Sequence, residues 1–172
     1  MSLNSARSVL LLPVILLTCL ALAPLARAQD RVKDPAGLFS LVPPQGWAVS
    51  LVQTAKESQV RADLASPQAF LTVSARRLPP DMTWPAWRAW IKKTSAQKLS
   101  PVEFGPFRLC GGPALAVLGR SLESKENTVE MVALERQGVG FVLTMAYPSQ
   151  LWKKFRPILE EVLKSFWCHP SP

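Results

Sequence analysis

The sequence is poor in the residue types on which most enzyme active sites depend. Its 172 residues include one histidine, His169, and one tyrosine, Tyr147. A nucleophilic triad or dyad needs a histidine held against a serine or cysteine, whereas His169 directly follows Cys168 near the C-terminus. Adjacent side chains at a chain end rarely form such a pair. We therefore expect no enzymatic activity, with a hidden site among Ser, Asp, Glu, Lys and Tyr147 as the alternative.

Metal-binding and phosphate-binding patterns are also missing. The chain has no Cys-x-x-Cys pair, no second histidine and no acidic loop with calcium-site spacing. Its nearest approach to a glycine loop, Gly111-Gly112-Pro113, lacks the lysine of a phosphate-binding loop and is predicted to be a turn. The sequence therefore predicts neither a metal nor another cofactor.

The first 28 residues have the three parts of a secretory signal peptide. Arg7 supplies the positive charge, residues 9–22 form an apolar run, and residues 26–28 (ARA) form a small-residue cleavage site. We expect cleavage after Ala28 and a periplasmic or secreted protein. A membrane anchor is disfavoured because the run is shorter than the roughly 20 residues of a spanning helix. Lipid attachment at Cys19 is disfavoured because Thr18 precedes that cysteine.

After the leader we expect a short tether at residues 29–37 and one globular domain at residues 38–172, with no transmembrane span. The leader removes Arg7 and Arg27 but no acid, so 18 basic and 12 acidic side chains remain, a net charge of about +6. Two cysteines also remain, Cys110 and Cys168. We expect them to pair, since disulfides persist outside the cytoplasm, and two unpaired thiols are the alternative.

Alternating and short apolar runs predict most of the strands. These lie at residues 38–42, 47–52, 58–65, 69–78, 114–122, 128–136 and 141–147, with turn-like connections between several of them. Helical periodicity appears twice, at residues 83–99 and from about residue 149 to 166. In the second helix the predicted apolar stripe includes Trp152, and Pro157 is expected to kink or divide the helix. Together these elements predict an α+β domain with an antiparallel sheet flanked by helices.

Two short motifs resemble a known family. Residues 37–47 (GLFSLVPPQGW) resemble the strand, proline-glycine turn and tryptophan that open PsbP-like domains, including their exported bacterial relatives. Residues 158–166 (ILEEVLKSF) resemble the last helix of those domains. The resemblance covers residues 35–167 and implies an α/β/α sandwich used as a binding or accessory subunit. Plant members serve at photosystem II, but no metal or partner residue of theirs can be carried over to this chain.

Basic and aromatic residues mark a candidate interaction surface. Residues 83–99 contain no acid, and Trp84, Trp87 and Ile91 share one face of the predicted helix, with Trp90 at its edge. The candidate surface consists of Trp90, Arg88, Lys92, Lys93, Lys153 and Lys154. Such charge attracts anionic envelope surfaces or acidic proteins, and a merely solvated basic face is the alternative. Nucleic acid is not expected as a partner, because the protein is predicted to be exported.

Two functions remain. The first is an exported, non-enzymatic accessory or binding protein of the cell envelope, which recruits an unidentified protein partner through its sheet edge or basic helix face. The second is a binder of membrane surfaces or small apolar ligands that uses Trp84, Trp87 and Trp90 with the neighbouring basic residues.

Overall fold

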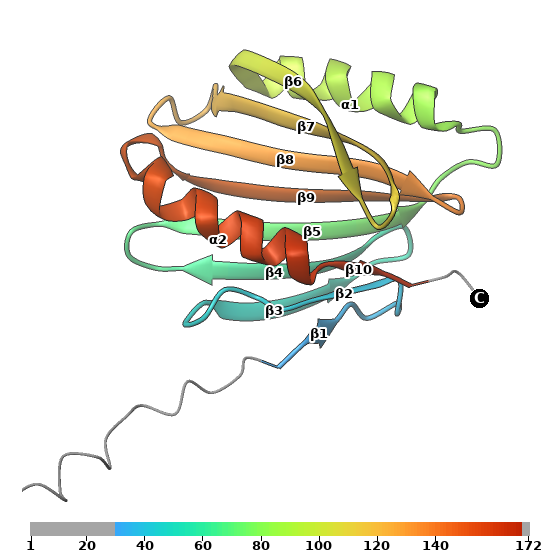
Figure 1. The fold of residues 1–172 in the computed structure, drawn as a ribbon, viewed down its shortest axis with the longest axis horizontal. Helices are drawn as coiled ribbons and strands as arrows, with labels where there is room; N and C mark the ends of the chain where they lie inside the picture. Colours follow the sequence, from blue (N-terminus) through green and yellow to red (C-terminus); the bar gives the residue numbers. More distant parts are fainter. Residues whose placement is uncertain (1–29, 170–172) are drawn as a thin grey trace, which may run out of the picture.

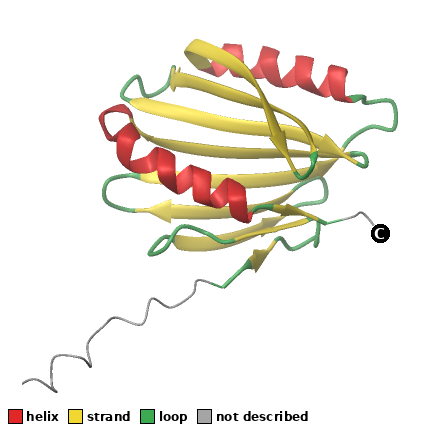
Figure 2. Cartoon of the chain, in the orientation of Figure 1, coloured by secondary structure: helices red, strands yellow, loops and turns green. Residues whose placement is uncertain are grey.

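A computed structural model describes residues 30–169 of the chain. The predicted signal peptide at residues 1–28, with its cleavage site at Ala28, lies outside the described residues. The described part is an α+β fold with an antiparallel sheet, as the sequence predicts (Figures 1 and 2).

The main sheet has seven antiparallel strands in the order β3-β4-β5-β9-β8-β7-β6. In chain order its strands are β3 (Ala48–Gln53), β4 (Ser58–Leu64), β5 (Ala69–Arg77), β6 (Leu99–Leu109), β7 (Gly112–Ser121), β8 (Asn127–Arg136) and β9 (Val139–Pro148). The predicted strands at residues 58–65 and 69–78 pair as an antiparallel hairpin, and the three predicted strands within residues 114–147 form an antiparallel meander. The two edges of the sheet are therefore β3 and β6.

Strand β6 is absent from the sequence prediction. Its residues include Pro101 and Pro106, which interrupt any apolar alternation. A proline cannot donate a ladder hydrogen bond and is tolerated mainly on edge strands. Because β6 pairs only with β7 among the described strands, this edge position accommodates both prolines.

The two helices pack on opposite faces of the main sheet. Helix α1 (Trp84–Lys98) buries Trp87 and Ile91 in one apolar cluster, which also contains Ala133 of β8. Helix α2 (Trp152–Ser165), preceded by the 3-10 turn η1 (Ser149–Leu151), belongs to a second cluster that includes Leu134 from the same strand. Since neighbouring residues of a strand face opposite sides, the two clusters lie on opposite faces.

A second, three-stranded sheet packs on the α2 side. It consists of β1 (Val32–Lys33), β2 (Phe39–Leu41) and β10 (Trp167–Cys168) in the order β1-β2-β10. Its strands bring the two ends of the described chain together, as Figure 1 shows. The expected tether at residues 29–37 thus contributes a strand, and Asp34 within it is buried at 3% exposure. This part of the tether prediction is corrected by the structure.

Helix α2 differs from its prediction in two respects. Pro157 does not divide the helix, which runs unbroken from Trp152 to Ser165, and the proline is exposed. Trp152, predicted to lie in the apolar stripe, is 48% exposed, while Phe155, Leu159 and Val162 form the buried face.

Candidate functional site

Helix α1 carries four of the six residues of the predicted interaction surface. Trp90, Arg88 and Lys93 are exposed and Lys92 is half-buried, while Trp87 beneath them is fully buried. Trp90 retains 41% exposure, which fits its predicted place at the edge of the apolar face. The structure therefore places these four side chains on one accessible helix.

The exposed indole of Trp90 is held in a stack. Its ring lies parallel to that of Trp87, with 5.0 Å between the ring centroids, and the guanidinium of Arg76 on β5 lies 4.4 Å from the Trp90 centroid. Arg76 also lies 4.8 Å from the Trp87 centroid. A cation over an indole is attracted by the negative face of the ring, so this stack fixes Trp90 against the sheet.

The remaining two residues of the predicted surface lie elsewhere. Lys153 and Lys154 are exposed on α2, across the sheet from α1, and Lys154 extends over the ring of Phe155. Lys92 lies on the other flank of α1, with its Nζ atom 5.2 Å from the ring centroid of Phe104 on β6. The structure therefore divides the predicted surface into two separate patches.

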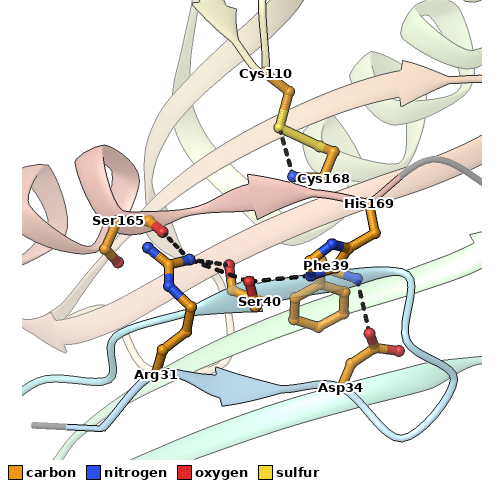
Figure 3. The surroundings of a disulfide bond; sticks show 8 residues. All are labelled: Arg31, Asp34, Phe39, Ser40, Cys110, Ser165, Cys168 and His169. Atoms are coloured by element: carbon orange, nitrogen blue, oxygen red, sulfur yellow. Dashed lines mark hydrogen bonds between the residues drawn. A yellow bond between two sulfur atoms is a disulfide. The ribbon is translucent and has the colours of Figure 1, made fainter.

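Cys110 and Cys168 form a disulfide with 6.0 Å between their Cα atoms (Figure 3). The following residue, His169, has its Nε2 atom 3.1 Å from the Ser40 hydroxyl, and its backbone N–H donates to the Leu38 carbonyl. A disulfide has no thiolate, so Cys168 is unable to serve as a nucleophile in this state. The Cys168-His169 pair fastens the C-terminal segment to β2.

The same small sheet is tied together by polar side chains (Figure 3). Arg31 donates to the Ser165 carbonyl at 2.8 Å and to the Ser40 hydroxyl at 3.1 Å. The carboxylate of Asp34 accepts the backbone N–H groups of Phe39 and Ala36. These contacts are internal to the fold, and we assign them a structural role.

The two edges of the main sheet differ sharply in chemistry. All six residues of β3, with sequence AVSLVQ, are exposed and none is charged. Val49, Leu51 and Val52 are among the most exposed large apolar residues of the described chain, at 40%, 52% and 43%. The opposite edge, β6, contains Pro101, Pro106 and charged side chains that hinder strand addition. The β3 edge therefore lacks the protection that the β6 edge has.

A groove runs along α2, on the face of the main sheet that α2 covers. It consists of two adjoining hollows of about 630 and 460 Å³, located between α2 and strands β6, β7 and β8. The side chains common to both hollows are Glu103, Leu118, Glu130 and Arg156. Phe107 on β6 and Leu163 on α2 add apolar surface to the larger hollow. We call this feature the α2 groove.

A polar cluster lies at the junction of the two hollows. The hydroxyl of Tyr147 on β9 donates to Oε1 of Glu130 on β8, and Arg156 of α2 approaches the other carboxylate oxygen at 3.7 Å. Tyr147 is 1% exposed, with its ring stacked on Phe155. Burial raises the pKa of Tyr147 well above its usual range, and the neighbouring Glu130 carboxylate adds to this increase. Tyr147 therefore stays protonated and acts as a hydrogen-bond donor.

Sequence reasoning did not find this cluster. Tyr147 is conspicuous as the single tyrosine, but Glu130 and Arg156 each occur among other charged residues. The three residues come from three elements, and antiparallel pairing of β8 with β9 places Glu130 and Tyr147 near each other. Only the register of that pairing, which the sequence does not specify in advance, identifies the set.

The described residues offer no evident metal centre. Within residues 30–169, no group of three or more His, Cys, Asp or Glu side chains is arranged to hold a metal ion. No helix in that range is both long and apolar enough to cross a membrane.

Comparisons with known proteins identify solved structures with a similar fold. No family model and no curated protein matches the chain. The solution structure of cyanobacterial PsbP from Synechocystis sp. PCC 6803 is similar over 85% of this chain and 96% of its own, with a TM-score of 0.61 and 16% identity. A Pseudomonas aeruginosa protein of unknown function is similar over 72% of this chain and 98% of its own, with a TM-score of 0.56 and 12% identity.

A third structure, from Bacteroides thetaiotaomicron VPI-5482, is similar over 84% of this chain and 50% of its own, with a TM-score of 0.60 and 12% identity. At such low identities these similarities concern the fold alone. They agree with the resemblance carried by residues 37–47 and 158–166. The fold of this chain is PsbP-like.

Proposed function

We propose that this chain is an exported binding protein of the cell envelope, without catalytic activity, and that it recruits a protein partner through the edge of its main sheet. In this proposal the leader is removed after Ala28 and the remaining domain acts outside the cytoplasm. The partner contributes an extended, largely uncharged strand that pairs with β3.

One observation carries this proposal, namely the unprotected β3 edge. Soluble proteins usually shield a sheet edge with charges, prolines or a covering element, because a free edge presents unpaired backbone groups. Here six consecutive exposed residues carry no charge, while β6 is shielded. Strand addition would satisfy the backbone groups of β3 and cover Val49 and Leu51.

The test uses the purified chain, with its disulfide intact, as bait against a detergent-solubilised envelope extract. Leu51→Lys places a charge in the middle of β3, so we expect it to abolish crosslinking to a specific protein that wild type retains in moderate salt. Leu122→Lys is the matched control, because Leu122 is 47% exposed and lies outside β3. Equal capture by wild type and both variants would refute the proposed edge.

A second candidate function is attachment to anionic lipid or polymer through α1. Trp90, Arg88 and Lys93 are all exposed on α1, which contains no acid. Amphipathic indoles combined with cations favour membrane interfaces. We would expect sedimentation with liposomes to rise with anionic lipid content and to fall in Trp90→Ala. The control is Trp167→Ala, which removes a 60% exposed indole from a different element.

A further inference from the structure

Within residues 30–169, one carboxylate oxygen of Glu130 lacks a close hydrogen-bond donor. Oε1 accepts the Tyr147 hydroxyl, whereas Oε2 lies 3.7 Å from Nη1 of Arg156, which is too long for a hydrogen bond. The Glu130 side chain is only 12% exposed, and it lines both hollows of the α2 groove. A carboxylate largely shielded from water is costly unless cations or hydrogen-bond donors satisfy it, so Oε2 is a favourable position for a positively charged donor.

Arg156 is the cation that approaches Glu130 Oε2, but it is not held firmly there. Its side chain is 49% exposed, and its Nε atom also contacts the Glu160 carboxylate at 3.4 Å. The guanidinium can therefore leave Glu130 and remain paired with Glu160 at the surface. Glu130, by contrast, is fixed by Tyr147 and by its strand.

Apolar side chains continue from the carboxylate along the groove. Phe107 and Leu118 are 37% and 36% exposed although they are large apolar residues, and Leu163 is half-buried on the facing helix. All three line the larger hollow together with Glu130. Its volume of about 630 Å³ falls in the range of small-molecule sites.

We propose that the α2 groove binds a small cationic amphiphile. The protonated amine of the ligand donates to Glu130 Oε2 and displaces Arg156, while its apolar chain lies over Phe107, Leu118 and Leu163. Charge complementarity selects this occupant, since the Glu130 carboxylate is 12% exposed, lies at the junction of the two hollows and is held in place by Tyr147. Besides Arg156, three cations line the groove: Lys164, which is paired with Glu161 at 2.7 Å, Arg108 in the larger hollow and Arg120 in the smaller one. This proposal does not depend on the β3 edge.

Calorimetric titration with three eight-carbon probes tests the class of ligand. We expect octylamine, below its micelle concentration, to bind the purified chain about tenfold or more tightly than octanol, because a charge-assisted hydrogen bond is lost with the alcohol. Octanoate should bind more weakly still. Equal binding of octylamine and octanol, tighter binding of octanoate, or no binding of octylamine would overturn the proposal.

Variants of the two charged residues test the site. Glu130→Gln should weaken octylamine binding about tenfold or more without changing octanol binding. Arg156→Gln removes the competing cation and should strengthen octylamine binding, whereas an anion site would be weakened by the same change. Glu123→Gln is the control for loss of an exposed carboxylate outside the groove and should change octylamine binding less than threefold. Since Arg156 is half-exposed, its variant keeps the test decisive even if Glu130→Gln does not fold.

The two proposals fail separately. Leu51→Lys is expected to retain octylamine binding, and Glu130→Gln is expected to retain capture of a protein partner. An octylamine titration abolished by Leu51→Lys in a folded protein would contradict a site in the α2 groove.

Discussion

Trp87 lies so close to Gly140 that a side chain at position 140 has no room. A Cβ atom built on Gly140 would lie 2.8 Å from Cζ2 of Trp87 and 2.9 Å from Cδ2 of Leu78. We expect Gly140→Ala to lower the free energy of unfolding by about 1–3 kcal/mol, because the indole must move within a packed cluster.

Urea unfolding checks this expectation, with Gly105→Ala as its control. Gly105 also lies in a strand, but a Cβ there would meet nothing within 4 Å. Its substitution should change stability by no more than about 0.5 kcal/mol. Equal effects of the two substitutions would show that Trp87 does not press on β9.

Arg76 is expected to stabilise helix α1 through the two stacked indoles. Arg76→Ala removes the guanidinium from Trp87 and Trp90 and should cost about 0.5–2 kcal/mol of unfolding free energy. It should also raise the iodide quenching of tryptophan fluorescence, since it uncovers Trp90. Arg77→Ala removes the adjacent exposed cation and controls for charge alone. Unchanged quenching in Arg76→Ala would argue against the stack.

Local periodicity was sufficient to predict the elements that bury one face. The alternation in residues 58–65 and 69–78 predicts β4 and β5, because inward side chains such as Val60 and Leu71 enter the core while their neighbours remain partly exposed. Helix α1 is predicted for the same reason, since Trp87 and Ile91 share its buried face. The coarse fold class follows from these signals.

Elements that depend on distant partners were not predictable in this way. Strand β1 has two residues and exists because it pairs with β2, and β10 exists because residues after α2 pair with β2 from the other side. Neither is long enough to display a period. The turn after β1 is held by the Asp34 carboxylate, a contact that a polar, tether-like composition conceals.

The candidate sites show the same division. The position of Trp90 could be predicted from helical spacing alone. A single surface that combines Lys153 with α1 could not be judged in this way, because that requires knowing that α1 and α2 lie on opposite faces. The α2 groove requires helix α2 and strands β6, β7 and β8 to come together, and it includes the exposed Trp152, which helical spacing assigns to the core. Both sites depend on contacts between residues far apart in the chain, which cannot be read from local sequence patterns.

The Cys110–Cys168 disulfide is expected to contribute substantially to stability. It links residues separated by 58 positions, for which the chain-entropy model gives about 4 kcal/mol. We expect the double variant Cys110→Ala/Cys168→Ala to lose up to that amount in urea unfolding. Wild type in reductant should behave like the double variant, and reductant should leave the double variant unchanged. A wild-type protein with no response to reductant would contradict this contribution.

Tyr147 should make the protein lose stability at alkaline pH. The pKa of Tyr147 is raised in the folded state, chiefly by burial, while an unfolded tyrosine titrates near pH 10, about its ordinary value. Above that pH the unfolded state releases a proton that the folded state retains, so unfolding becomes favoured by about 1.4 kcal/mol per pH unit. The stabilisation is thus complete below about pH 10 and is lost as pH rises toward the folded pKa.

The single tyrosine makes this dependence directly measurable. The near-ultraviolet absorbance of tyrosinate reports Tyr147 alone, because the chain contains no other tyrosine. In the folded protein this signal should be absent near pH 10 and appear only as the chain unfolds. Tyr147→Phe should remove the tyrosine part of the alkaline loss and leave the part due to lysines, which both proteins share. Reversible titration of tyrosinate near pH 10 in the folded wild type would mean that Tyr147 is open to solvent and that its hydroxyl is not committed to Glu130.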